Sequence, residues 1–315
     1  MTESSLHGHN GIILICPGTG EYIEILVLFM VITMIRSQVF VAAIASSEDS
    51  ICLSPQILPP TALAGMTKTI SAVQPTWVNP ETLLFSCDES GYQNPWMSCL
   101  IALSDGTYTV STHPLLSESI VSDFSDPSWW LGCSNIAVID PQSALFSVPK
   151  AGRHLFAVVH LDGRLKEINS PYVQAVRLHS VSTRKVAFFG TKIDEPQELI
   201  VCVFDEDYVP TYSTIETRST AINLRPFISH PESIYLFKHL PGEAYITPIH
   251  LIFYPPHNPN YAPSKEEKPC AIVNVHGGPA WREGQGLDME KQYFTSRGWA
   301  WYESVYHRFS LTKRF

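Results

Sequence analysis

The sequence is short of charge, and the charge it carries is mostly acidic. Charged residues make up 16% of the 315 residues, below the roughly 25% of an average soluble domain. Lys and Arg number 21 against 30 Asp and Glu, which gives a formal net charge of -9 at pH 7. Because phosphate binding needs a basic face, this composition argues against nucleic acid as a main partner.

Paired cysteines are also missing. The seven cysteines are an odd number, and none belongs to a Cys-x-x-Cys pair: Cys16, Cys52, Cys87, Cys99, Cys133, Cys202 and Cys270. This pattern lacks the spacing of a zinc site and of a disulfide framework. We therefore expect buried free thiols in a reducing compartment, a cytoplasmic location, no metal and no cofactor.

No apolar run is long enough to cross a membrane without a charge. A spanning helix needs about 20 apolar residues, and the segment Tyr22–Ala45 reaches that length only if Arg36 is buried. Glu21 and Glu24 stand where a signal peptide would carry basic residues. The β-branched content favours buried strands or a misassigned start. A membrane segment or anchor, with a membrane-associated protein, is the alternative for this part of residues 1–65.

Amphipathic helix patterns are missing between about Ser71 and His239. Short apolar runs alternate there with turn residues, which is typical of a sandwich, barrel or propeller. A weak internal repeat pairs two strands that close on Asp105-Gly106, then on Asp162-Gly163, and more loosely on Asp205. Repeats of roughly 40 to 50 residues with four strands each are typical of propeller blades. We expect a partial β-propeller of about three to four blades over residues 66–240.

The pattern of apolar and turn residues changes after His239. A strand is expected at Ile249–Tyr254, then a Pro-rich exposed loop at Pro255–Pro269, then an apolar strand at Ala271–Val275. The proline pairs and clustered charges in that loop are typical of exposed turns. These elements open a second expected unit, residues 241–315.

One amphipathic helix is expected in this second unit. Leu287, Tyr293 and Phe294 have the spacing of one helical face, and Gly298 is well placed to end the helix. A strand, a turn and a helix in this order begin an α/β unit.

The apolar strand ends in His276-Gly277-Gly278-Pro279. Two glycines let the backbone turn sharply and approach a ligand closely, because no Cβ intervenes. Backbone N–H groups freed at such a turn can point at a developing negative charge, as in an oxyanion hole. A plain Gly-Gly turn after a buried strand is the alternative reading of the tetrapeptide by itself.

Three segments follow one another in this part of the chain: "IFYPPHNP", "KPCAIVNVHGGP" and "LDMEKQYFTSRGWA". Together they resemble the prolyl oligopeptidase family of serine peptidases, in particular its dipeptidyl aminopeptidase and acylaminoacyl peptidase branch. "DESGYQNPW" is similar to a propeller turn of the form Asp-x-x-Gly-x-x-Asn-x-Trp/Tyr in that branch. The resemblance covers roughly Ser71 to Ala300. It implies a β-propeller followed by an α/β-hydrolase domain.

The resemblance also implies an activity, the hydrolysis of short peptides near their N-terminus. A serine would attack the carbonyl, a histidine would take its proton, and an aspartate would orient the histidine. Gly277 and Gly278 match the oxyanion-loop glycines, with the Gly278 N–H as the expected donor. His276 matches a histidine that holds the loop rather than acting as the base, and Pro279 matches the proline that stiffens the turn.

The family's nucleophile elbow, Gly-x-Ser-x-Gly, does not occur in the 315 residues. "GCSNI" comes nearest, but Ile136 stands where the second glycine should follow Ser134. After Ala300 an apolar strand and a Gly-rich turn are expected, and the chain reads "WYESVYHRFSLTKRF" instead. We therefore expect a truncated family member that lacks the catalytic Ser, Asp and His and is inactive as given. A non-catalytic propeller interaction module with a vestigial hydrolase stub is the alternative.

Overall fold

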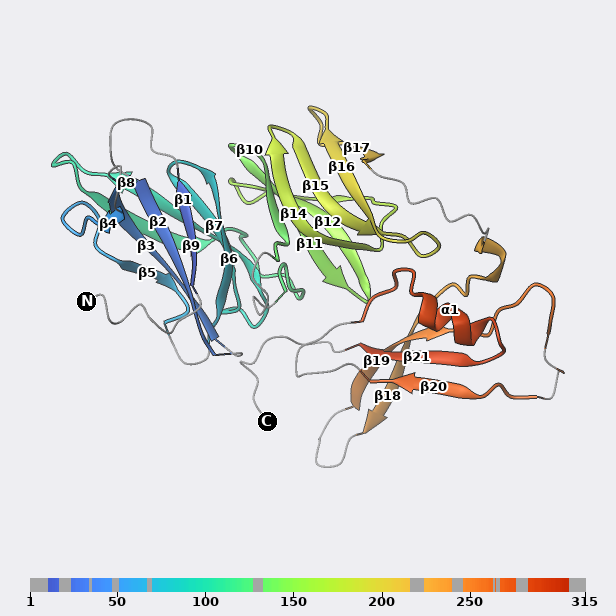
Figure 1. The fold of residues 1–315 in the computed structure, drawn as a ribbon. Coiled ribbons are helices and arrows are strands. Elements are labelled where there is room, and N and C mark those ends of the chain that lie inside the picture. The colour runs from blue at the N-terminus through green and yellow to red at the C-terminus, as the bar shows by residue number, and fades with distance from the viewer. Residues whose placement is uncertain are drawn as a thin grey trace.

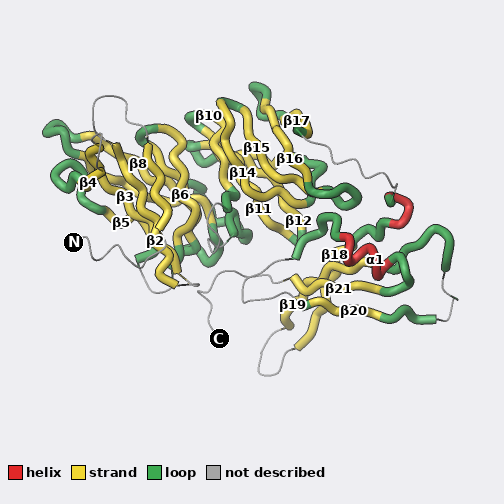
Figure 2. Tube along the Cα trace, viewed as in Figure 1, coloured by secondary structure: helices red, strands yellow, loops and turns green. Residues whose placement is uncertain are grey.

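The chain folds into five sheets and very little helix within the part that a computed structural model describes (Figures 1 and 2). The described residues are 11–16, 24–33, 36–46, 51–66, 70–126, 133–215, 224–239, 246–262, 264, 267–275 and 283–305. The first four sheets are antiparallel, and the fifth contains one parallel pair. The expected β-rich architecture is thus confirmed.

Three of the sheets are four-stranded meanders in which each strand pairs with the next along the chain, as in propeller blades. The first contains β6 (Ala72–Asn79), β7 (Thr82–Cys87), β8 (Asn94–Ala102) and β9 (Tyr108–Pro114). The second contains β10 (Ile136–Asp140), β11 (Ser143–Lys150), β12 (Arg153–His160) and β13 (Leu165–Ile168). The third contains β14 (Gln174–Ser182), β15 (Lys185–Thr191), β16 (Glu198–Phe204) and β17 (Pro210–Thr214).

The repeat seen in the sequence falls at the same place in each meander, the turn between its third and fourth strands. The carboxylates of Asp105, Asp162 and Asp205 each accept the backbone N–H two residues further on, at 3.0, 3.1 and 2.9 Å. Gly106 and Gly163 have φ of +81° and +85°, a backbone region in which glycine is unstrained. Local turn chemistry therefore explains why this signal was visible in the sequence.

The "DESGYQNPW" turn links its own meander to the connection that follows β9. The Asp88 carboxylate accepts the Ser71 backbone N–H at 2.6 Å, and Gly91 takes a φ of +95°. The Asn94 side chain donates to the Ile120 carbonyl and accepts the Ile120 N–H, at 2.9 and 2.7 Å. Each of these polar residues of the motif thus closes a specific backbone contact.

Asp88 is buried together with Asp123, and this predicts a pH dependence of stability. Burial raises the pKa of Asp88 to about 6, with a smaller contribution from the charge of Asp123. The folded state therefore disfavours the ionised form, so stability falls as pH rises from about 4 to about 6. Asp88→Asn is expected to remove this loss, so that its free energy of unfolding at pH 7 exceeds that of the wild type by about 1–3 kcal/mol. The variant should therefore unfold at a higher urea concentration.

Urea unfolding between pH 4 and 7 would test that expectation. The gap between Asp88→Asn and the wild type should widen with pH, and parallel curves would refute it. Asp162→Asn, at an exposed carboxylate whose pKa is lowered by its hydrogen bonds to Arg164, is the control and should not reproduce the widening.

The apolar N-terminal segment forms strands. The first sheet contains β1 (Gly11–Cys16), β2 (Glu24–Thr33), β3 (Arg36–Ser46), β4 (Ile51–Leu53) and β5 (Thr61–Ala64). Val39, Val41 and Ala43 of β3 are buried in one cluster with Leu83 and Phe85 of β7. The strand interpretation is confirmed for the described residues, in which no helix is long and apolar enough to span a membrane.

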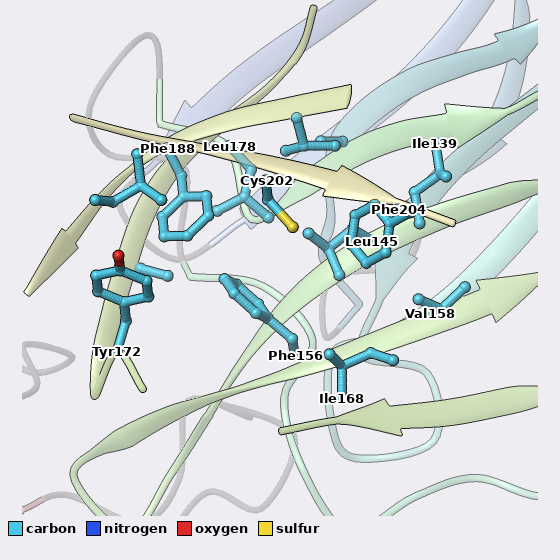
Figure 3. Close-up of a cluster of buried hydrophobic side chains, with 14 residues drawn as sticks. Ile139, Leu145, Phe156, Val158, Ile168, Tyr172, Leu178, Phe188, Cys202 and Phe204 are labelled. Atoms are coloured by element: carbon cyan, nitrogen blue, oxygen red, sulfur yellow. The ribbon is translucent and has the colours of Figure 1, made fainter. Parts of the chain in front are cut away.

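The second and third meanders pack face to face over a shared core (Figure 3). Phe156 of β12 and Phe188 of β15 meet edge to face, with ring centroids 5.1 Å apart. Tyr172, in the connection to β14, packs edge to face on Phe188 at 5.5 Å. Such aromatic contacts add to the apolar area that the two sheets bury.

Six cysteines are free, and of these only two are buried, Cys87 and Cys202. Burial raises the pKa of the Cys87 and Cys202 thiols to about 12. Cys52 and Cys270 are exposed. The prediction of buried thiols is therefore wrong for these two, which lie in a short strand and beside an edge strand, where little covers them.

The fifth sheet has the strand order β18-β19-β21-β20. Its members are β18 (Glu232–His239), β19 (Ile246–Tyr254), β20 (Ala271–Asn274) and β21 (Ala300–Val305). Helix α1 (Met289–Thr295) connects β20 to its parallel neighbour β21, so the expected strand–helix–strand unit is present. The division placed at residues 240 and 241 falls between β18 and β19, which pair with each other. The structure therefore starts this sheet at Glu232.

Helix α1 forms as expected, but its buried face differs in part from the expected one. The Asp288 carboxylate caps it by accepting the Glu290 N–H at 2.9 Å. Its buried residues are the polar Lys291, Gln292 and Thr295, whereas Tyr293 is 53% exposed. The prediction is wrong for Tyr293 but is confirmed for Phe294, which packs on the buried cluster of Ile252, Tyr254 and Trp301. Lys291 and Gln292 are buried as well because they meet Glu303 and Ser229 beneath the helix.

Candidate functional site

The four residues predicted to form the oxyanion loop, His276, Gly277, Gly278 and Pro279, lie outside the described residues. The structure does describe the chain up to Val275 and again from Glu283. The candidate site is therefore built from these two flanks and from the side chains that contact them.

The first flank is the carboxyl end of β20. Strands β20 and β21 are parallel, with Asn274 opposite Glu303. Carboxyl ends of parallel strands meet at one edge of a sheet, and ligands of open α/β sheets bind at that edge. Residues 276–282, which contain Gly277 and Gly278 and are called the Gly-Gly segment below, thus follow the strand end at which this class of sheet binds its ligands.

A buried ion pair lies directly beneath this strand end. The Lys291 ammonium contacts Glu303 Oε1 at 3.0 Å, with Lys291 3% and Glu303 0% exposed. Trp301 Nε1 donates to Glu303 Oε1 at 2.6 Å, and Asn274 Nδ2 donates to Glu303 Oε2 at 2.9 Å. Both carboxylate oxygens are therefore occupied, which is the condition for keeping a charge inside a protein.

Two further carboxylates face the same ammonium. Glu283 Oε2 and Asp288 Oδ2 lie 3.7 and 3.6 Å from Lys291 Nζ. The ammonium also lies 5.5 Å from the centroid of the Tyr254 ring. Burial raises the pKa of Tyr254, with a smaller contribution from the charge of Glu303, so its hydroxyl stays protonated and donates to the Gly284 carbonyl at 3.3 Å.

The second flank, residues 283–287, lies against the strand ends of the meanders (Figure 1). The Gln285 backbone N–H donates to the Gly152 carbonyl at 2.8 Å, and the Leu287 N–H donates to the Lys192 carbonyl at 2.9 Å. Gln285 Nε2 donates to the Ala151 carbonyl at 3.2 Å. The chain that follows the Gly-Gly segment is therefore hydrogen-bonded to the second and third meanders.

The turn at Gly152 permits this close approach. Its φ is +78°, and a Cβ built there would lie 2.5 Å from the Ile252 Cδ1 atom of the fifth sheet. Glycine suits this turn because any side chain would be strained at this φ, and a Cβ would also displace the end of the Ile252 side chain. The contact between the β11–β12 turn and the fifth sheet depends on this position.

Sequence reasoning missed Lys291, Glu303 and Gln285. A glutamate inside the mostly apolar run "AWYESV" was a possible signal, since a charge within a buried strand needs a partner. Nothing in the sequence pointed to Gln285, whose partners Ala151 and Gly152 are far away along the chain. Within the described residues, no group of three or more His, Cys, Asp or Glu side chains could hold a metal ion.

No family model matches the chain, and no curated protein matches it. Solved structures do match its fold. A puromycin-hydrolyzing peptidase from Mycobacterium tuberculosis aligns with a TM-score of 0.72 over 93% of this chain and 42% of that one, at 22% identity. Two structures of puromycin hydrolase align with TM-scores of 0.68 and 0.70, at 20% and 19% identity. These two alignments cover 90% and 94% of this chain and 39% and 42% of the solved ones.

The chain therefore spans about two fifths of the length of these peptidases. At such identities the likeness establishes a shared fold. The architecture implied by the resemblance to the prolyl oligopeptidase family is thus confirmed at the level of the fold, and the structures that share it are peptidases.

Proposed function

We propose that this chain is the propeller and oxyanion-loop portion of a serine peptidase of the prolyl oligopeptidase type, which acts on short peptides. One observation carries the proposal. The Gly-Gly segment follows the carboxyl end of a parallel strand, and the chain after it is bound to the strand ends of a propeller-like array. A peptide at that edge would lie between the fifth sheet and the meanders.

The chemistry supplied by this portion is electrostatic. A peptide carbonyl attacked by a serine develops a negative charge on its oxygen, and the Gly278 N–H would donate to that oxygen. One such donor contributes about 3 kcal/mol to the transition state. The meanders would limit access to short chains, and the reaction type needs neither metal nor cofactor.

The 315 residues contain no Gly-x-Ser-x-Gly elbow, so we propose that the chain by itself hydrolyses no peptide bond. An oxyanion donor without a nucleophile retains only the small effects of binding and charge stabilisation. The activity of the whole enzyme would need a serine, an aspartate and a histidine that the printed sequence does not provide in the expected motif.

A fluorophosphonate probe, which labels activated serines covalently, would test this proposal. The purified 315-residue chain is expected to remain unlabelled, with a serine peptidase such as trypsin labelled in parallel as the positive control. Labelling of this chain at one serine in a near-stoichiometric amount would contradict the proposed inactivity. Heat-denatured chain controls for non-specific reaction.

A further inference from the structure

The two flanks of the Gly-Gly segment meet at one buried ion pair. Asn274, before the segment, donates to Glu303 at 2.9 Å. Glu283, after it, faces the Lys291 ammonium at 3.7 Å. Since Lys291 and Glu303 contact each other at 3.0 Å, three polar contacts connect one flank to the other.

Each of the four side chains comes from a different part of the fifth sheet's framework. Asn274 is the last residue of β20, Lys291 lies on α1 and Glu303 lies on β21. Glu283 belongs to the segment bound to the meanders, two residues before Gln285. The pair thus connects the sheet, the helix and the propeller-bound segment at a single point.

A buried ion pair of this kind contributes little net stability, because desolvation offsets most of the attraction between the charges. Its directional contacts do fix geometry, since an unpaired charge at either position would be costly. The neighbouring Trp301 Nε1–H holds the Glu303 carboxylate in place at 2.6 Å. The arrangement is therefore better explained by positioning than by stability.

We propose that Lys291 and Glu303 are positioning residues that fix Asn274 relative to Glu283. They thereby hold the two ends of the Gly-Gly segment at a fixed position relative to the second and third meanders. The consequence for catalysis, a correctly aimed oxyanion donor, rests on the proposed function. The positioning itself does not, and it is measurable without activity.

Amide hydrogen exchange of the purified chain, read by mass spectrometry of its peptides, tests the positioning. The first variant is the double substitution Lys291→Met with Glu303→Gln, which removes both charges and leaves no buried charge unpaired. Peptides covering residues 270–288 are expected to exchange roughly tenfold faster or more, while those from β18, β19 and β10–β17 stay unchanged. A purely structural role predicts either no change or faster exchange across the whole fifth sheet, β18 and β19 included.

Two isolated changes at Asn274 separate hydrogen bonding from packing. Asn274→Asp keeps the shape of the side chain but places a second carboxylate beside Glu303, and Asn274→Ala removes the donor. Positioning predicts that the Asp variant accelerates exchange at the flanks at least as much as the Ala variant. If Asp behaves like the wild type, packing alone explains the contact and the proposal is overturned.

Asp162→Asn, which removes an exposed ion pair with Arg164, is the matched control and should leave exchange at residues 270–288 unchanged. Unaltered exchange there in the double variant and in both Asn274 variants would refute the proposal. The outcome is independent of the fluorophosphonate result, so labelling of the chain would overturn the proposed inactivity and leave the positioning pair standing.

Discussion

Lys291→Met is expected to lower the free energy of unfolding of the fifth sheet by about 3–5 kcal/mol, because it leaves the buried Glu303 carboxylate without its counter-charge. Trp301 and Asn274 would still donate to that carboxylate, but neither is charged. Urea unfolding followed by tryptophan fluorescence measures the loss, and Trp301 at the site contributes to that signal.

Two comparisons decide whether the lost charge is the cause. Lys192→Met makes the same substitution in a partly exposed pair with Glu195 and should cost less than about 1 kcal/mol. Adding Glu303→Gln to Lys291→Met should recover much of the loss, since the buried charge is then gone. Equal losses in the two lysine variants, or no recovery, would show that burial of the pair is not what matters.

Phe156→Ala is expected to destabilise the second and third meanders by about 3–5 kcal/mol, because it opens a cavity in a dense core. The ring is 1% exposed and packs on Phe188, so neighbouring backbone on both sheets would have to move to fill the space. Chemical denaturation of the variant, compared with the wild type, gives the loss directly.

Phe189→Ala is the matched control for that core. Phe189 is the next residue along β15 from Phe188 but points to the opposite side and is 36% exposed. Its replacement should cost far less, by about 1 kcal/mol or under. Comparable losses at Phe156 and Phe189 would mean that the shared core does not dominate the stability of these two meanders.

The meanders could be predicted from the sequence because their signals are local. Asp105, Asp162 and Asp205 each bond to a backbone group two residues away, so a short stretch of sequence contains the whole cause of the turn. The strands at Ile249–Tyr254 and Ala271–Val275 were likewise visible as apolar runs, and the structure ends them within a few residues of the expected positions.

The candidate site was less predictable because its contacts join distant parts of the chain. Helical periodicity favoured Leu287, Tyr293 and Phe294 as the buried face, yet Lys291 is buried because Glu303 lies opposite it on β21. Periodicity alone counts a lysine as a surface residue and carries no information on a partner across an element boundary. The motif glycines Gly277 and Gly278 remain a prediction, since they fall outside the described residues.

The order of strands in the fifth sheet has a consequence for synthesis on the ribosome. Strand β21 lies between β19 and β20, although it is made after both. Strand β20 therefore has no sheet partner among the described strands until β21 emerges. The contacts of Asn274 and Lys291 with Glu303 cannot form before that point. Because such non-local pairing is slower than hairpin formation, the Gly-Gly segment would acquire its fixed flanks last, after the meanders have already folded.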